Sequence, residues 1–551
     1  MGLLNLLACP LLLLGQLTPQ TSAQILYHIH HGDTKTGLNC YLDSIDTTKE
    51  HDYTLLQQAG INLLEQGASS SDVEVQMMCL LGAGVSLSPP LLPILEKGIQ
   101  SDNMQAQLAA LNFLSMLEDD QADRIFLSAL SSPFLLTRLE ACFNLSKKNH
   151  PSVLAHLQSL IIKVPEPLRA LFPQIVVNLD SNSANQMMRQ LLSDGDLVTR
   201  CEAIIATAKA HRDDFLPQVR LLASQAQVIQ QECAAMALGE LQDRQAVNTL
   251  KALTYSRQKS VRLAACYSLY QLGDKSGLPI IEAEGEDLYA VVLRGKIPTK
   301  QSKKQLLDSV RFGQRDIRLN ATLALLEMRD ENCIPYLKEI ITSEKKDIGY
   351  IQSGSPGGAI KFWKSVVSAS YKEKLYPAVL QESAALRQQV LLKTLDFNED
   401  AFLDLAQSIF DEDQRSLIPI TLELLTNHRS SKAMTMLHHQ QQHSTSEFVR
   451  TYCDLALYKL GEEGPYEQNL VAWVKERQNT MMIRFREEKS SERESKFSLN
   501  PEEQSRLLIT VFETLAQAQN HAGIDALIHA IAHGHAHNRY ALAGLLIRTT
   551  E

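Results

Sequence analysis

The stretch VRLAACYSLYQLGD, residues 261–274, decides the fold of this chain. Its apolar residues Val261, Ala265, Leu269 and Leu272 follow one another at steps of four, four and three. Such steps place side chains along one stripe of an α-helix. The stretch therefore predicts a helix with one buried face.

The last two residues of this stretch predict a helix end followed by a new helix. Gly273 can adopt the left-handed conformation that ends a helix. The side-chain oxygen of Asp274 can then cap the next helix. The order helix, glycine and aspartate thus encodes two consecutive helices joined by a tight turn.

The same pattern recurs along the chain. Residues 231–243 match it without a gap at an offset of 31, and residues 200–213 form a degenerate copy one step further back. Residues 317–330 match at an offset of 56, and residues 449–461 match at an offset of 188. A period near 31 with two helical patterns per period indicates units that bury their apolar faces only by stacking on neighbours. We therefore expect an all-α fold, a solenoid of stacked helical pairs.

These repeats resemble the HEAT-repeat family, in particular its short, phycobilisome-lyase-like form with the core V-R-x-A-A-x-x-x-L-x-x-L-G-D. A proline follows the aspartate in both, here Pro279 after Asp274 and Pro335 after Asp330. The chain as a whole is also similar to uncharacterised exported helical-repeat proteins of chlamydia-like bacteria. The resemblance to HEAT repeats implies a superhelix whose long, shallow surface binds a protein partner.

Arginine recurs at one position of the repeat and aspartate at another. The arginines are Arg262, Arg318 and Arg450, and the aspartates are Asp243, Asp274 and Asp330. The arginines could form a ladder for an acidic ligand, or each could pair with a loop aspartate of a neighbouring repeat. Similar arginines in the HEAT family serve stacking, so the resemblance favours a structural role.

Composition limits the class of partner. The 551 residues carry a net charge of -10, whereas a protein that holds nucleic acid or anionic lipid along its whole length needs a basic track. Local basic patches remain compatible with this balance. Cys233, Cys266 and Cys453 occupy interior positions of the repeat helices, which indicates buried thiols and no disulfide framework.

The first 23 residues have the pattern of a secretory signal, although they lack lysine and arginine. Residues 3–14 are mostly apolar but too few to span a bilayer, and small residues at 21 and 23 suit cleavage before Gln24. We predict a signal peptide at 1–23, an exported protein that is periplasmic or secreted, and no integral membrane span in the mature chain. The alternatives are a buried N-terminal helix and a retained apolar tether.

The remaining boundaries follow from breaks in the helical pattern. We expect an N-terminal leader segment without sustained helical period at 24–52 and the solenoid at 53–484. Irregular breaks near 279–315 and 348–360 predict a repeat with a surface insertion and a glycine-rich loop. Residues 485–499 indicate a charged linker or exposed helix, and residues 500–551 a helical C-terminal cap.

Two groups of residues are candidates for a site. His529 and His533 are four residues apart on one helical face, a spacing at which two imidazoles can share a zinc ion. Ala530 stands where a zinc protease would need glutamate, which excludes zinc-protease catalysis. The favoured alternative to a zinc site is that both are ordinary histidines on the polar face of a helix. Phe362 and Trp363 follow the glycine-rich break, and we expect them to lie in a partner-binding loop.

The sequence contains no nucleophile elbow, no nucleotide fingerprint and no paired Cys-x-x-Cys motif. We therefore predict a non-catalytic scaffold or assembly factor that binds a protein partner and uses no cofactor and no nucleic acid. The alternatives are a HEAT-fold enzyme of lyase or glycosylase type and a membrane-tethered adaptor. A bound chromophore or a basic inner surface would favour the enzyme.

Overall fold

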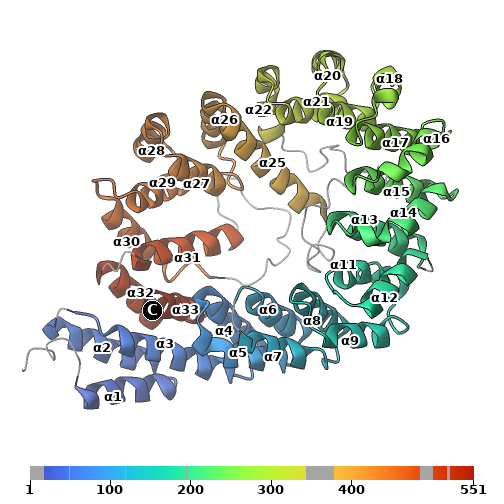
Figure 1. Ribbon diagram of the computed structural model, residues 1–551. Helices are drawn as coiled ribbons and strands as arrows, with labels where there is room; N and C mark the ends of the chain where they lie inside the picture. Colours follow the sequence, from blue (N-terminus) through green and yellow to red (C-terminus); the bar gives the residue numbers. More distant parts are fainter. Residues whose placement is uncertain are drawn as a thin grey trace, which may run out of the picture. The chain divides into compact units, whose positions relative to one another are not determined.

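The computed structural model describes residues 18–48, 50–117, 120–193, 195–342, 378–483, 501–517 and 521–550 (Figure 1). These ranges form helices and contain no strand, so the predicted all-α fold of solenoid type is confirmed. The chain divides into two compact units. Unit 1 comprises Met1–Arg138 and Arg429–Glu551, and unit 2 comprises Leu139–His428.

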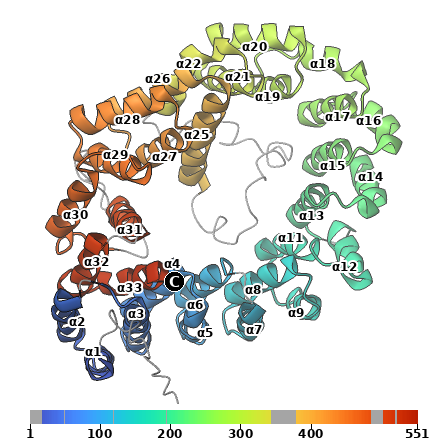
Figure 2. The same cartoon turned by 60° about the vertical axis from the view of Figure 1, so that its left-hand side comes forward.

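Unit 2 is built from helices that alternate between two layers (Figure 2). Successive first-layer helices pack on one another, and each second-layer helix packs on the first-layer helix that follows it. The first layer contains α11 (Phe172–Val176), α13 (Leu197–Lys209), α15 (Val228–Glu240), α17 (Lys259–Gln271), α19 (Leu288–Lys296) and α21 (Arg315–Glu327). The second layer contains α12 (Asn182–Ser193), α14 (Leu216–Ser224), α16 (Val247–Leu253), α18 (Leu278–Ala283), α20 (Lys300–Phe312) and α22 (Ile334–Thr342).

The ends of unit 2 are less regular than this stack. On one side lie α8 (Leu135–Lys147), which crosses the boundary between the units, α9 (Ser152–Leu160) and the four-residue α10 (Glu166–Arg169). On the other side lie α25 (Ala378–Phe397), α26 (Glu399–Asp411) and α27 (Ile418–His428).

The expected insertion at 279–315 is wrong, because two shorter repeats fill this range. First-layer helices begin at residues 197, 228, 259, 288 and 315, so successive starts are 31, 31, 29 and 27 residues apart. The last two steps together give the offset of 56 seen in the sequence. Helices α18 and α19 have only 6 and 9 residues, which accounts for the shortening without any inserted loop.

Helix α17 is buried on more than the single face predicted from its apolar stripe. Val261 and all residues from 263 to 269 are buried, whereas Leu272, the last residue of the stripe, is only half-buried. Helices α15, α16, α18 and α19 all contact α17, so neighbours cover it from several sides. A first-layer helix therefore contributes nearly its whole surface to the core.

The turn after α17 is the one that the sequence predicted at Gly273. Gly273 has φ 87°, and the backbone N–H of Asp274 donates to the carbonyl oxygen of Leu269 at 2.8 Å. This six-to-one bond is the Schellman motif that ends a helix. The same left-handed position is held by Gln242 at φ 55° and Arg329 at φ 54°, so glycine is not required at every turn.

Unit 1 combines helices from both ends of the chain (Figure 1). The N-terminal helices are α1 (Pro19–His30), α2 (Thr34–Thr48), α3 (Tyr53–Ala68), α4 (Val73–Ser86), α5 (Leu92–Ile99), α6 (Met104–Leu114) and α7 (Asp120–Ala129). The C-terminal helices are α28 (Ser431–His443), α29 (Glu447–Lys459), α30 (Tyr466–Arg477), α31 (Pro501–Gln517), α32 (His521–His533) and α33 (Asn538–Thr550).

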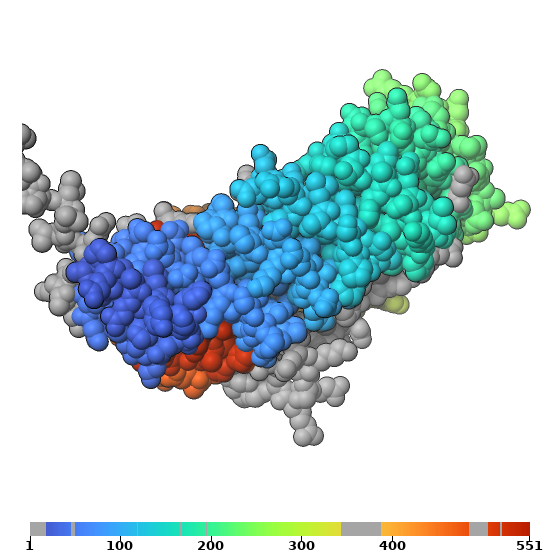
Figure 3. All heavy atoms as spheres, turned by 90° about the horizontal axis from the view of Figure 1, so that it is seen from below, coloured from blue at the N-terminus to red at the C-terminus, as the bar shows by residue number. Residues whose placement is uncertain are grey.

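The C-terminal helix α33 packs against α3 and α4, which begin more than 450 residues earlier in the chain. In the space-filling view the C-terminal atoms lie directly against the N-terminal helices (Figure 3). Glycines permit this approach: a methyl group on Gly544 would overlap the carbonyl oxygen of Gly82, and one on Gly82 would overlap the carbonyl oxygen of Tyr540. The predicted C-terminal cap is therefore helical and also covers N-terminal helices.

The N-terminal segment is helical where the sequence showed no sustained period. Helices α1 and α2 occupy most of residues 24–52, and α1 packs on α3. The expected cleavage site before Gln24 lies inside α1, and residues 1–17 lie outside the described residues, so cleavage stays a prediction. In the described part of the chain, no helix is both long and apolar enough to cross a membrane.

We expect Gly273→Ala to lower the free energy of unfolding by about 1 kcal/mol, because an alanine at this positive φ is strained. A methyl group there would meet no other atom within 4 Å, so the cost is purely conformational. Chemical denaturation measures the change, with Gly285→Ala as the control at a glycine that is equally uncrowded and lacks a positive φ. Equal effects of the two substitutions would contradict the assigned turn.

We expect Gly544→Ala to destabilise unit 1 by about 1–3 kcal/mol, because the added methyl group must push α33 away from α4. Thr549→Ala, near the end of the same helix, should change stability by less than about 0.5 kcal/mol. Thermal denaturation followed by circular dichroism compares the two variants. A Gly544→Ala protein as stable as the control would mean that α33 does not pack as described.

Candidate functional site

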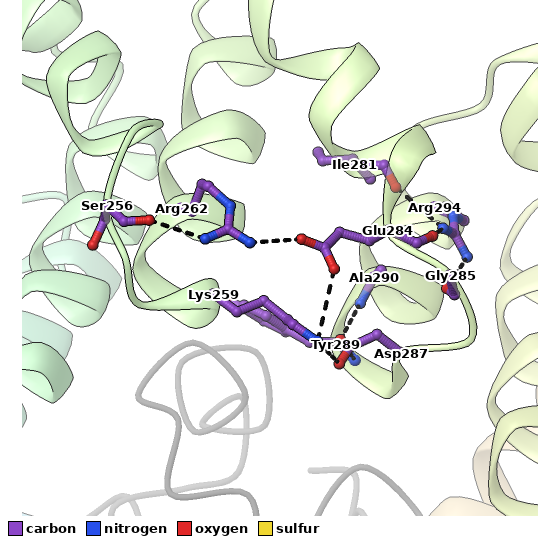
Figure 4. Close-up of polar contacts among 10 residues, drawn as sticks. All are labelled: Ser256, Lys259, Arg262, Ile281, Glu284, Gly285, Asp287, Tyr289, Ala290 and Arg294. Atoms are coloured by element: carbon purple, nitrogen blue, oxygen red, sulfur yellow. Dashed lines mark hydrogen bonds and ion pairs between the residues drawn. The ribbon is translucent and has the colours of Figure 1, made fainter.

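Arg262, the first of the predicted ladder arginines, joins two loops of unit 2 (Figure 4). Its Nη1 donates to the carbonyl oxygen of Ser256 at 2.9 Å, and its Nη2 donates to Oε1 of Glu284 at 2.7 Å. Lys259 lies beside it, with Nζ 3.0 Å from Oδ2 of Asp287. The start of α17 is thus held by carboxylates of the loop between α18 and α19.

The same loop is fixed from its other side by Arg294, a residue that the sequence analysis did not single out (Figure 4). The Arg294 side chain donates to the carbonyl oxygens of Ile281, Glu284 and Gly285 at the end of α18. The residue is buried, and burial lowers the pKa of its guanidinium. Arg294 therefore caps the carbonyl end of α18 in the manner expected of a cation there.

The predicted pairing of ladder arginines with loop aspartates is wrong. Arg318 donates to both carboxylate oxygens of Glu339, at 3.0 and 2.7 Å, rather than to an aspartate. Arg450 donates to the carbonyl oxygen of Ser444 at 2.6 Å. Glu339 lies in α22, and Glu284 lies at the end of α18, so each glutamate comes from the second-layer helix that follows the arginine helix.

The three aspartates instead cap their own turns and bind a cation from the preceding second-layer helix. Asp243, Asp274 and Asp330 each accept the backbone N–H two residues further on. Their ion-pair partners are Arg220, Lys251 and Lys303, in that order. Hydrogen bonds from Ser276 and Lys251 lower the pKa of Asp274 to about 2.

The ladder position also recurs in α4 and α6, where glutamine replaces arginine. Gln76 donates to the carbonyl oxygen of Ser70 at 2.7 Å, and Gln107 donates to that of Ser101 at 2.7 Å. Arg262 and Arg450 make the same bond to a serine six residues earlier. A neutral side chain therefore satisfies the position, and the spacing Ser-x5-Arg/Gln was a sequence signal that the repeat alignment missed.

His529 and His533 lie together on α32, as their spacing predicted, with ring centroids 4.7 Å apart. Their nitrogens have protein partners: Nδ1 of His529 lies 3.2 Å from the Gln478 amide nitrogen, and Nε2 of His533 lies 2.8 Å from Oδ1 of Asn39. Within the described ranges no group of three or more histidine, cysteine, aspartate or glutamate side chains could hold a metal ion.

The remaining predicted site residues cannot be placed. Phe362 and Trp363, together with the glycine-rich break at 348–360 and the charged segment 485–499, lie outside the described residues. Their proposed roles stay predictions.

Helix α20 carries a group of cations, in the range where the sequence predicted a surface insertion. Lys300, Lys304 and Arg311 are exposed and fall within about 40° of one another around the helix. None of them has a hydrogen-bond or ion-pair partner in the described part of the chain. We call these three residues the basic stripe. Phe312, whose side chain is 80% exposed, flanks its end.

Many other cations of unit 2 are held by carboxylates. Ion pairs join Arg212 to Asp214, Lys251 to Asp274, Arg318 to Glu339 and Lys338 to Glu412. Such pairing neutralises the local electrostatic potential. The three unpaired charges of the basic stripe lie along about 16 Å of one helix, so their positive potentials add. The basic stripe is therefore suited to attract an acidic group.

Comparisons with known proteins give no identity for this chain. No protein-family model matches the sequence, and no curated protein matches it. Among solved structures, the chain is similar to the crystal structure of Kap121p bound to Pho4p, with 12% identity, 96% of this chain covered and a TM-score of 0.29. The match covers 65% of the length of that chain. The fold assignment rests on the helices described above.

We expect Arg262→Ala to lower the free energy of unfolding by about 1–2 kcal/mol, because the Ser256 carbonyl and the part-buried Glu284 lose a hydrogen-bond donor. Arg257→Ala removes an exposed arginine of the same loop and should have little effect. Melting temperatures of the two variants measure the difference. Equal stability of both would return Arg262 to the candidates for ligand binding.

Proposed function

We propose that this protein is a non-catalytic scaffold that binds an acidic segment of a protein partner, with the basic stripe of α20 as a contact. The observation that supports this is the combination of three exposed, unpaired cations on one helical face with the exposed ring of Phe312. An acidic segment that also carries an apolar side chain matches both features.

The chemistry of the buried thiols favours a binding function over thiol catalysis. Burial raises the pKa of Cys266 and of Cys333 to about 12. A reactive cysteine needs a lowered pKa, because the thiolate is the nucleophile. These side chains act as small core residues.

A protein segment fits the stripe better than nucleic acid does. The stripe is short, the exposed Asp308 lies between Lys304 and Arg311 on the same side of α20, and the exposed Asp316 follows the helix. A long polyanion would extend past the three cations onto an acidic protein with a net charge of -10. A short acidic segment avoids that repulsion. Export of the chain remains part of the proposal and rests on the apolar run at 3–14.

We expect the full chain to bind a fluorescent peptide of six glutamates followed by phenylalanine, measured by anisotropy at low salt. The triple variant Lys300→Gln, Lys304→Gln and Arg311→Gln should raise the dissociation constant about tenfold, since three exposed charge pairs contribute about 0.5 kcal/mol each. Added salt should weaken wild-type binding because the contacts are exposed.

The matched control removes three exposed cations that lie outside α20: Arg244→Gln, Arg257→Gln and Lys275→Gln. Both triple variants change the net charge equally, so a loss of binding shared by both would show only a long-range field and contradict the stripe. Tighter, stripe-dependent binding of a single-stranded DNA of similar length would contradict the proposed class of partner.

A further inference from the structure

Histidines concentrate in unit 1, on the two segments that come from opposite ends of the chain. Unit 2 contains four of the 16 histidines, and unit 1 contains the other 12. Helix α2 packs against α32 (Figure 2), and four imidazole rings lie at or beside this contact. These rings belong to His51, His521, His529 and His533. We call the α2–α32 contact with these rings the histidine clasp.

His51 is the buried centre of the clasp. Its side chain is 1% exposed, and its ring lies between those of Tyr41 and His521, with centroids 6.2 and 4.9 Å away. The Tyr41 hydroxyl oxygen accepts the backbone N–H of Asp52 at 3.0 Å and lies 3.3 Å from Nδ1 of His51. These contacts suit a neutral imidazole whose Nδ1 accepts the tyrosine proton.

The groups that act on the charge of His51 come from both sides of the contact. Burial lowers the pKa of His51, the carboxylate of Asp525 and a backbone hydrogen bond to His521 raise it in part, and the His521 ring lowers it. Nε2 of His51 lies 3.6 Å from Oδ1 of Asp525, a carboxylate that is itself 54% exposed. Exposure weakens this compensation, because water screens the carboxylate.

His533 forms the second point of the clasp. Its Nε2 donates to Oδ1 of Asn39 on α2 at 2.8 Å. Burial lowers the pKa of His533, and so do the neighbouring His529 and Lys35 of α2. When His529 and His533 are protonated, their two rings and Lys35 of α2 therefore form a group of three neighbouring cations.

We propose that the histidine clasp is an acid-sensitive latch that releases α2 from α32, whereas α33 stays packed on α3 and α4. The contact of α33 with Gly82 and Gly60 depends on close backbone packing. The two contacts between the chain ends thus respond differently to pH. This inference does not depend on the proposed partner.

The direction follows from the lowered pKa values of both rings. The closed clasp binds fewer protons than the open one, so it is fully stable above pH 6.5, the ordinary value, and weakens as the pH falls through the lowered values. Each histidine can raise the opening equilibrium by up to about tenfold per pH unit in this window. Two histidines together can reach about a hundredfold.

Hydrogen exchange measured by mass spectrometry on the full chain tests the latch. Between pH 7.5 and 5.5, after correction for the intrinsic exchange rate, amides of α2 and of the start of α32 should exchange at least tenfold faster. Amides of α4 and α33 should keep their protection. Unchanged protection of α2 would overturn the proposal, and equal loss in α33 would show general unfolding and overturn it as well.

Substitutions test whether the pH dependence of hydrogen exchange comes from the histidines of the clasp or from other histidines. The pair His51→Phe and His533→Gln keeps the ring stacking and a donor for Asn39, and it should abolish the pH dependence. The matched control, His439→Gln and His443→Gln, removes an exposed stacked pair within α28 and should leave the pH dependence intact. If the clasp variant does not fold, NMR titration of wild-type His51 and His533 decides, and values at or above 6.5 for both would overturn the latch.

Discussion

The structure depends on one constraint: a helical pair of this type cannot bury its own apolar surface and needs neighbours on both sides. Helix α17 shows how complete the sharing is, because every residue from 263 to 269 is buried among contacts with four other helices. The first helices of a solenoid lack such a neighbour. Here α33 supplies it, and the glycines Gly82 and Gly544 allow backbones from opposite ends of the chain to approach closely.

Polar groups determine the geometry of the repeat once burial has made it stable. A Schellman turn ends α15, α17 and α21, and the aspartate that follows each of them caps the next turn and binds a cation from the preceding second-layer helix. The ladder side chain fixes the loop before the helix, as arginine in α17 and as glutamine in α6. The ladder arginines bind groups of the protein itself, such as the Ser256 carbonyl. The cations of the basic stripe have no such partner in the described part of the chain.

The two contacts between the chain ends have different chemistry. The contact of α33 with α4 depends on glycine and apolar packing, which pH does not alter. The contact of α2 with α32 depends on neutral imidazoles, whose pKa values lie closest to physiological pH. The proposed binding surface on unit 2 and the proposed pH-sensitive contact in unit 1 can therefore be tested separately.

The sequence by itself determined the class of fold, the turn at Gly273 and the caps at Asp243, Asp274 and Asp330, because these depend on residues close together in the chain. It also paired His529 with His533. It failed on the arginine partners and on the shortened repeats at α18 and α19, since both depend on how helices about 20 residues apart approach each other. Only the tertiary structure placed α33 on α3 and α4 and Asn39 beside His533, because contacts across nearly 500 residues leave no periodic signal in a single sequence.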